Sequence, residues 1–200
     1  LFIGLKNLTP GANLSLLFQL AESTANTESE KARVAWQYLS NNEWKDLREG
    51  FEILNDATEG LTSTGIVKIA VPTDITNGPE NTVMPRDFHW LKVAALANAD
   101  AVCETIGIHA QAVHATFTIR PENDTNRLAK PLEAGKLAKL EIGNGNIKQV
   151  QQLYQSFGGK AVEANDHYYQ RASERLRHKG RAINLFDYER LVLQAFPQIF

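Results

Sequence analysis

Cysteine is almost absent from this sequence, in which Cys103 is the only one among 200 residues. A single thiol cannot form an internal disulfide or a thiol-rich metal site. Long apolar runs are absent too, since none approaches the roughly 18 residues that a membrane-spanning helix requires. The chain also lacks an excess of charge, because 21 basic and 23 acidic residues leave a net charge of −2. The composition therefore gives no reason to expect binding to nucleic acid or to a membrane.

Motifs for catalysis and for cofactor binding are missing as well. The histidines form no His-x-Glu or His-Glu-x-x-His group, and His109 and His114 would lie on opposite faces of a strand. The glycine-rich stretches 143–145 and 156–159 lack the lysine and the strand–helix context of a phosphate loop. No nucleophile elbow is present, and no basic motif lies near Cys103 to lower its pKa. We therefore expect no enzyme activity, no metal and no cofactor.

The remaining composition, 43% hydrophobic and 22% charged, is that of an ordinary globular protein. Two hundred residues suffice for one large domain, or for one domain with part of another. The sequence begins at Leu1 rather than at a methionine and stops at Phe200 directly after an apolar pattern. We therefore expect it to be a piece of a longer polypeptide.

Short β-type segments separated by turn residues fill the first 119 residues. Val34, Trp36 and Tyr38 alternate with other residues, and Asn41-Asn42 supplies a turn before 43–47, which indicates a hairpin. Further strands are expected at 1–8, 14–20, 65–71, 88–96 and 106–119, the last being long enough to leave the sheet. No helical period appears in this region, so the pattern predicts an antiparallel β-sandwich over residues 1–119.

The composition changes at Arg120, and residues 120–131 have the polar, proline-containing character of a linker. We expect residues 132–200 to form a smaller α/β segment, with a strand at 135–142 and a tight turn at 143–146. The pattern of 147–157 is consistent with either an extended or a helical conformation. The fold class that we expect is therefore mainly β with α, an α+β protein that ends in two helices.

The two helices are predicted to be joined through a basic segment at residues 175–183, which we call the basic elbow. The first is predicted to begin at Asn165 or Asp166, either of which can cap its opening turn, and to end in a cationic turn before Gly180. The second is predicted to begin at Asn184, with Asp187 three residues later as a weak capping box. Its apolar residues recur with helical spacing before Pro197, so one face is expected to be buried: Tyr188, Leu191, Val192 and Ala195.

The end of the first helix and the elbow concentrate positive charge. Arg171, Arg175, Arg177, His178, Lys179 and Arg181 lie within eleven residues. One interpretation is a helix end whose cations offset its own dipole, assisted by Glu174. The other is a surface that meets an acidic partner or phosphates.

The tryptophans Trp36, Trp44 and Trp90 also allow two interpretations. On strands they could form a platform for a sugar ring, or they could belong to the core of the sandwich, as large aromatic residues more often do.

The C-terminal sequence resembles a known family. SERLRHKGRAI at 173–183, DYERLVL at 187–193 and AFP at 195–197 closely resemble the baseplate J-like proteins of contractile injection systems, which are phage-tail-derived machines. Residues 1–5, 16–19, 36–39 and 89–93 resemble the same proteins more weakly, through aromatic and glycine spacing.

The resemblance implies a structural wedge subunit that acts through protein–protein contacts. Its expected partners are other baseplate, spike and sheath-proximal subunits, without nucleic acid or membrane, and the chain by itself is expected to be monomeric. Assembly would take place in the cytoplasm before the chain becomes part of a phage-tail-like particle. The residues expected to contact a partner are Arg171, Arg175, Arg177, Lys179, Arg181, Asp187, Tyr188 and Arg190. The alternative is a carbohydrate-binding β-sandwich module of a larger secreted protein.

Overall fold

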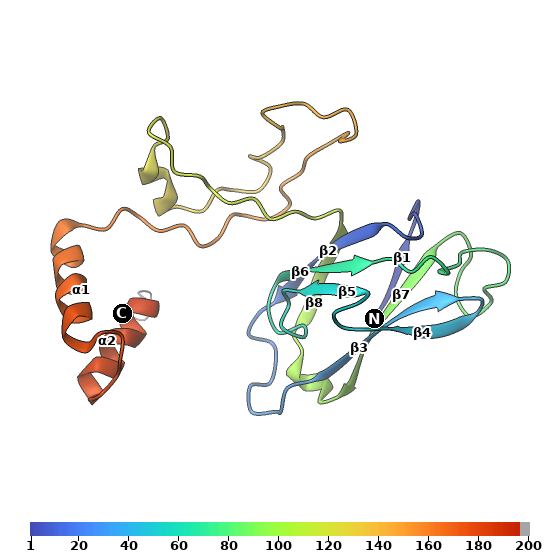
Figure 1. Ribbon diagram of the computed structural model, residues 1–200, viewed down its shortest axis with the longest axis horizontal. Helices are drawn as coiled ribbons and strands as arrows, with labels where there is room; N and C mark the ends of the chain where they lie inside the picture. Colours follow the sequence, from blue (N-terminus) through green and yellow to red (C-terminus); the bar gives the residue numbers. More distant parts are fainter. Residues whose placement is uncertain (197–200) are drawn as a thin grey trace. The chain divides into compact units, whose positions relative to one another are not determined.

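The structure is a computed structural model that describes residues 1–196, apart from the side chain of His178 (Figure 1). Contacts divide the chain into a unit that covers Leu1–Thr116 and a second unit that begins at Phe117. The first unit contains all the strands of the described residues, and the second contains both α-helices.

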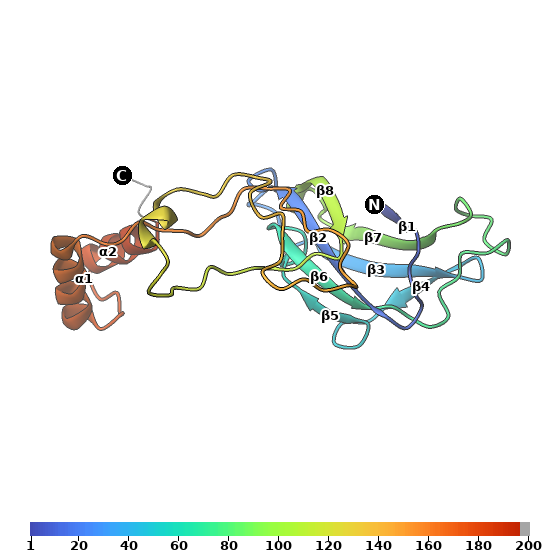
Figure 2. The same cartoon turned by 90° about the horizontal axis from the view of Figure 1, so that it is seen from above.

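Two four-stranded antiparallel sheets make up the first unit (Figure 1, Figure 2). In spatial order, the first sheet contains β1 (Phe2–Leu5), β7 (His89–Ala97), β3 (Arg33–Ser40) and β4 (Glu43–Leu47). The second sheet contains β5 (Ile53–Asp56), β6 (Gly65–Ala70), β2 (Asn13–Ala21) and β8 (Glu104–Ala110). A short 3-10 helix, η1 (Ala99–Ala101), precedes β8. The predicted fold class is confirmed.

The core lies between the sheets and is formed by alternate residues of the strands. In β2, for example, Leu16 and Phe18 are fully buried whereas Leu17 between them is only partly buried. Phe18 meets Trp36 of the other sheet edge to face, with ring centroids 5.5 Å apart. Because alternate side chains of a strand point to opposite faces, the period-2 pattern of the sequence specifies which face is buried.

The predicted hairpin is confirmed in β3 and β4. Ser40 pairs with Glu43, so Asn41 and Asn42 alone form the turn. Both asparagines adopt the left-handed conformation, with φ of 48° and 68°. A two-residue turn with two positive φ angles matches the twist of the paired strands, and asparagine tolerates this conformation.

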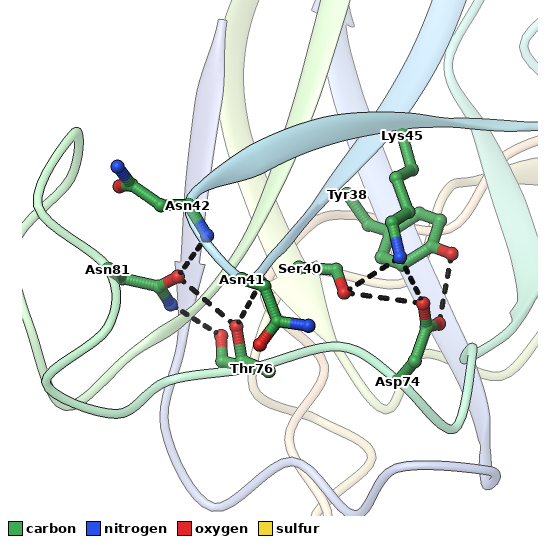
Figure 3. A network of polar contacts seen from close by, with 8 residues as sticks. All are labelled: Tyr38, Ser40, Asn41, Asn42, Lys45, Asp74, Thr76 and Asn81. Carbon is green, nitrogen blue, oxygen red and sulfur yellow. Dashed lines mark hydrogen bonds and ion pairs between the residues drawn. The ribbon is translucent and has the colours of Figure 1, made fainter.

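A polar network anchors the loop after β6 to this hairpin (Figure 3). The Asp74 carboxylate accepts a hydrogen bond from the Tyr38 hydroxyl at 2.9 Å and from Lys45 Nζ at 2.6 Å. Asn81 Oδ1 accepts the backbone N–H of Asn42 at 3.0 Å. The Lys45 ammonium lowers the pKa of Asp74, and burial together with the bond to Asp74 raises the pKa of Tyr38 to about 12. The loop of residues 73–87 is therefore fixed by side chains rather than by sheet pairing.

The prediction of a long strand at 106–119 is wrong beyond residue 110. β8 ends at Ala110, and Gln111 adopts a left-handed φ of 58°, which an extended strand cannot contain. β5 is present although the sequence pattern did not predict it separately.

The strand expected at 135–142 is also absent. Gly135 and Leu137 donate their backbone N–H groups to the main chain and the side chain of Gln152, at 2.8 Å and 3.1 Å, instead of to a neighbouring strand. Gln152 Nε2 in turn donates to the Leu132 carbonyl at 3.2 Å. The predicted tight turn inside this closed loop is confirmed by a 2.9 Å bond from the Ile147 N–H to the Asn144 carbonyl. Residues 147–157 are neither helix nor strand.

The second unit contains the short helix η2 (Thr125–Ala129), α1 (Asn165–His178) and α2 (Leu185–Ala195). Both predicted helices are confirmed, and α1 and α2 form a helical hairpin whose facing side chains contact one another. Pro197, expected to stop the second helix, lies outside the described residues.

Candidate protein–protein interface

The predicted capping box at the start of α2 is complete. Asn184 Oδ1 accepts the backbone N–H of Asp187 at 3.0 Å, and Asp187 Oδ2 accepts the N–H of Asn184 at 3.3 Å. Asp187 Oδ2 also accepts the N–H of Ile183 at 3.2 Å. A carboxylate at this position satisfies free donors of the first turn and interacts favourably with the helix dipole. Asp187, 4% exposed, is the only buried residue that the structure describes in 117–196.

Two arginines connect α1 with α2 around one aromatic ring. Arg177 Nη2 lies 3.5 Å from Asp187 Oδ1, and Arg190 Nε lies 3.5 Å from Glu174 Oε1. The guanidinium groups of Arg177 and Arg190 lie 4.7 Å and 4.8 Å from the centre of the Phe186 ring. These long ion pairs and cation–π contacts orient the hairpin, but partly exposed contacts of this kind contribute only about 1 kcal/mol or less each.

The start of α1 differs from the prediction. Ala164 occupies the N-cap position, and neither Asn165 nor any other side chain caps the first turn in the described residues. Arg171 instead forms a bidentate salt bridge with Glu163, in which Nε and Nη2 donate to the two carboxylate oxygens at 2.8 Å and 2.7 Å. These hydrogen bonds lower the pKa of the Glu163 carboxyl. It also lies over the ring of Tyr168, at 5.5 Å. Arg171 therefore holds the beginning of its own helix.

The other cations of the basic elbow have no carboxylate partner within residues 1–196, which the structure describes. Arg175, Lys179 and Arg181 are exposed, and none forms an ion pair within the described part of the chain. The Lys179 N–H bonds the Arg175 carbonyl at 2.8 Å, and Lys179 takes a left-handed φ of 51° that ends the helix. The six cations among the eight predicted contact residues thus divide into three arginines that form ion pairs within this unit, Arg171, Arg177 and Arg190, and three cations that form none in the described residues. Of the other two, Asp187 belongs to the capping box and Tyr188 is exposed.

Apolar side chains accompany the unpaired cations. Leu176, Ile183 and Leu185, around the elbow, are 77%, 80% and 76% exposed.

The expectation that one face of α2 is buried is wrong for the described residues, because Tyr188 is 59% and Val192 46% exposed. Nothing else in 117–196 covers this face, so the helical period correctly identified an apolar stripe but not a contact within the chain.

Two contributors to the hairpin escaped the sequence analysis: Glu163 and Phe186. Glu174, expected to assist the cationic end of the first helix, instead pairs with Arg190 of α2. Glu163 precedes the helix and Phe186 pairs with arginines from two helices, so only the folded hairpin reveals their roles.

The three tryptophans do not lie together on one face, because Trp36 faces the core. Trp36 is 5% exposed and lies in the core, as the second interpretation predicted. Trp44 packs against Phe2, with centroids 5.6 Å apart, and under the Lys92 ammonium. Trp90 Nε1 donates to the Pro85 carbonyl at 2.8 Å.

No group of three or more His, Cys, Asp or Glu side chains within the described residues is placed to hold a metal ion. None of the described helices has the length and apolar character needed to cross a membrane.

Comparison with known proteins supports the baseplate expectation in its general form. No curated protein matches the chain. A family model described as "Baseplate protein PVC11-like" matches residues 1–200, which is the whole sequence. The match supports a structural baseplate role in a phage-tail-like particle; it does not extend to the baseplate J-like proteins, and it lends no support to a carbohydrate-binding module. The chain belongs to the PVC11-like family of baseplate proteins.

Proposed function

We propose that this baseplate protein is joined to a neighbouring subunit through the α1–α2 hairpin. The observation that carries the proposal is the lack of burial in the second unit. Asp187 is the only buried residue among described residues 117–196. Helices that leave their apolar stripe exposed gain little from folding alone, and large exposed apolar surfaces mark interaction sites.

The chemistry of the surface indicates the kind of partner. Leu176, Ile183 and Leu185 supply apolar area, and the unpaired cations Arg175 and Arg181 flank them. Such a surface fits an apolar patch bordered by carboxylates, because complementary charge orients two surfaces while apolar contacts supply most of the affinity. The hairpin's internal arginines keep the two helices in position for this contact.

The likeness to baseplate J-like proteins supports a place in the baseplate wedge, beside other baseplate, spike and sheath-proximal subunits. We place assembly in the cytoplasm, before the particle is complete. The role is binding, and we assign no catalytic step to the chain.

The test is a charge reversal at the unpaired cations, Arg175→Glu combined with Arg181→Glu. Neither side chain has an ion pair to lose in the described residues. The free energy of unfolding of the chain should therefore change by less than about 1 kcal/mol. Incorporation into particles, followed by electron microscopy, should fail because reversed charges across an interface cost several kcal/mol.

A matched control carries the same change of charge elsewhere in the unit. Lys139→Glu with Lys148→Glu alters two exposed lysines of the loop between residues 137 and 152. Particles should form normally with this control. Normal particles with the Arg175 and Arg181 reversal would show that the cluster is only a solvated helix end.

A further inference from the structure

Two asparagine–glycine pairs occur in the sequence, Asn77-Gly78 and Asn144-Gly145. The asparagine of such a pair can react with its own backbone, because glycine has no Cβ to keep the following peptide nitrogen away from the side-chain amide. Both reacting groups belong to the same short segment of chain, so the step is intramolecular and needs no enzyme. The local structure of each pair therefore decides how readily the reaction takes place.

Asn144-Gly145 lies in a fully exposed loop of the second unit. Residues 133–149 are all exposed. A Cβ placed on Gly145 would meet no atom within 4 Å, so nothing crowds this part of the backbone. The Gly145 N–H donates no hydrogen bond within the described residues. Water and hydroxide can therefore reach the Gly145 nitrogen, and no acceptor in the described chain holds its proton.

The side chain of Asn144 is folded over the peptide that follows it. Asn144 Oδ1 accepts the backbone N–H of Asn146 at 3.0 Å, and the Asn144 carbonyl accepts the N–H of Ile147 at 2.9 Å. The first of these bonds closes an Asx turn, and the ring of that turn contains both Asn144 Cγ and the Gly145 nitrogen. The two atoms that must join are thus kept near each other. The Asn146 N–H also lies where negative charge develops on Oδ1 during the attack, and a donor in that place stabilises the charge.

Asn77-Gly78, in the loop after β6, differs in both respects. The Gly78 N–H donates to Glu80 Oε1 at 3.2 Å, and a Cβ on Gly78 would collide with the Glu80 carboxylate. The neighbouring negative charge disfavours the loss of a proton from the Gly78 nitrogen. The Asn77 side chain accepts no hydrogen bond among the described residues, so no donor stabilises charge on its oxygen.

We propose that Asn144 is a site of spontaneous deamidation, and that the fold directs the reaction to Asn144 rather than to Asn77. The Gly145 nitrogen gives its proton to hydroxide and attacks Asn144 Cγ, so a new C–N bond closes a succinimide ring. The Cγ–Nδ2 bond breaks, and the amide nitrogen takes a proton from water and leaves as ammonia. Water then adds to either carbonyl of the ring and opens it. The products are aspartate and isoaspartate, and no oxidant, reductant or cofactor takes part.

Either product changes the loop. A carboxylate replaces a neutral amide, so the net charge of −2 becomes one unit more negative. In isoaspartate the main chain runs through the former side chain, which lengthens the backbone inside the turn that the 2.9 Å bond to Ile147 closes. The inference concerns this loop and does not depend on the contact proposed for the α1–α2 hairpin.

Peptide mapping by mass spectrometry of the full chain, incubated at mildly alkaline pH, tests the proposal. Trypsin releases residues 140–148, which contain Asn144 and Asn146, and residues 69–86, which contain Asn77. In the folded chain Asn144 should convert at least about tenfold faster than Asn77, because only Asn144 has both the free nitrogen and the donor. Asn146, which precedes a β-branched residue, should stay intact. In urea the two Asn-Gly rates should approach each other. Folded-state conversion at Asn77 as fast as at Asn144, or a ratio that urea does not change, would overturn the proposal.

Two substitutions separate the contributions of the glycine and of the carboxylate. Gly145→Ala fits the structure, because the position has open space and no positive φ, and it should slow conversion of Asn144 at least about tenfold by obstructing ring closure. Glu80→Ala removes the acceptor of the Gly78 N–H and should speed conversion of Asn77 severalfold while leaving Asn144 unchanged. Conversion of Asn144 at the same rate in the alanine variant of Gly145, or of Asn77 at the same rate without Glu80, would count against the proposal.

Discussion

The His89 imidazole is buried in surroundings that do not stabilise its positively charged form. It is 6% exposed, it lies on the same face of β7 as the core residues Leu91 and Val93, and its Nδ1 has no hydrogen-bond partner among the described residues. Burial lowers the pKa of His89 below its usual value. The folded protein therefore holds this imidazole neutral, whereas the unfolded chain takes up a proton near its ordinary pKa of about 6.5.

This difference predicts a loss of stability in weak acid. Above the unfolded pKa both states are neutral and His89 adds no pH dependence. As the pH falls below about 6.5, only the unfolded state gains the proton, so the free energy of unfolding decreases by up to about 1.4 kcal/mol per pH unit until the folded pKa is reached. Urea unfolding at several pH values between about 5 and 8 should show this slope in the wild type and a smaller one in His89→Leu. Equal slopes in both proteins would contradict the prediction.

At the scale of single elements, an asparagine lies at the start of each helix but in a different position: Asn184 is the N-cap of α2, whereas Asn165 is the first residue of α1. Asn184 caps α2 through its side chain, whereas Asn165 begins α1 without a cap bond. Asn184→Ala should destabilise α2 by about 1 kcal/mol, which amide hydrogen exchange along Leu185–Ala195 would register as faster exchange.

Asn165→Ala is the matched control for the cap. Its side chain makes no bond to the first turn, and alanine favours the helix interior, so exchange in α1 should be unchanged or slower. Faster exchange in both helices, or in neither, would show that the capping box does not limit the stability of α2.

At the scale of the whole molecule, the two units differ in how they are stabilised. The apolar core residues belong to the first unit, and those with the lowest exposure include Leu16, Phe18 and Leu91. Residues 1–116 should therefore fold alone with a β-type far-ultraviolet spectrum and one cooperative urea transition. Residues 117–200 by themselves should unfold without a sharp transition, because the described part of this unit buries no apolar side chain.

The same experiment tests the domain boundary expected after residue 119, which stays a prediction. Residues 1–119 and 1–116 should have the same midpoint if the boundary lies in this region. A helical or coil spectrum of either fragment would contradict the sandwich as an independent domain.

The sequence by itself determined the features that depend on neighbouring residues. The alternation around Trp36 specified a half-buried strand, and Asn41-Asn42 specified a two-residue turn that only residues tolerant of positive φ can form. Asn184 and Asp187 located the start of α2 because both bonds of a capping box lie within four residues. The family could be recognised at the level of a baseplate protein from the C-terminal segment alone.

Only the tertiary structure decided the features that depend on distant partners. β1 pairs with β7, almost ninety residues later, and no local pattern specifies this choice. Arg177 and Arg175 lie two residues apart on one helix, yet only Arg177 points to Asp187 and Phe186, while Arg175 remains without an ion pair in the described residues. Periodicity shows that a face is apolar, but the packing of the chain decides whether its own core or another subunit covers that face. For this reason the apolar stripe of α2 was visible in the sequence, whereas its exposure was not.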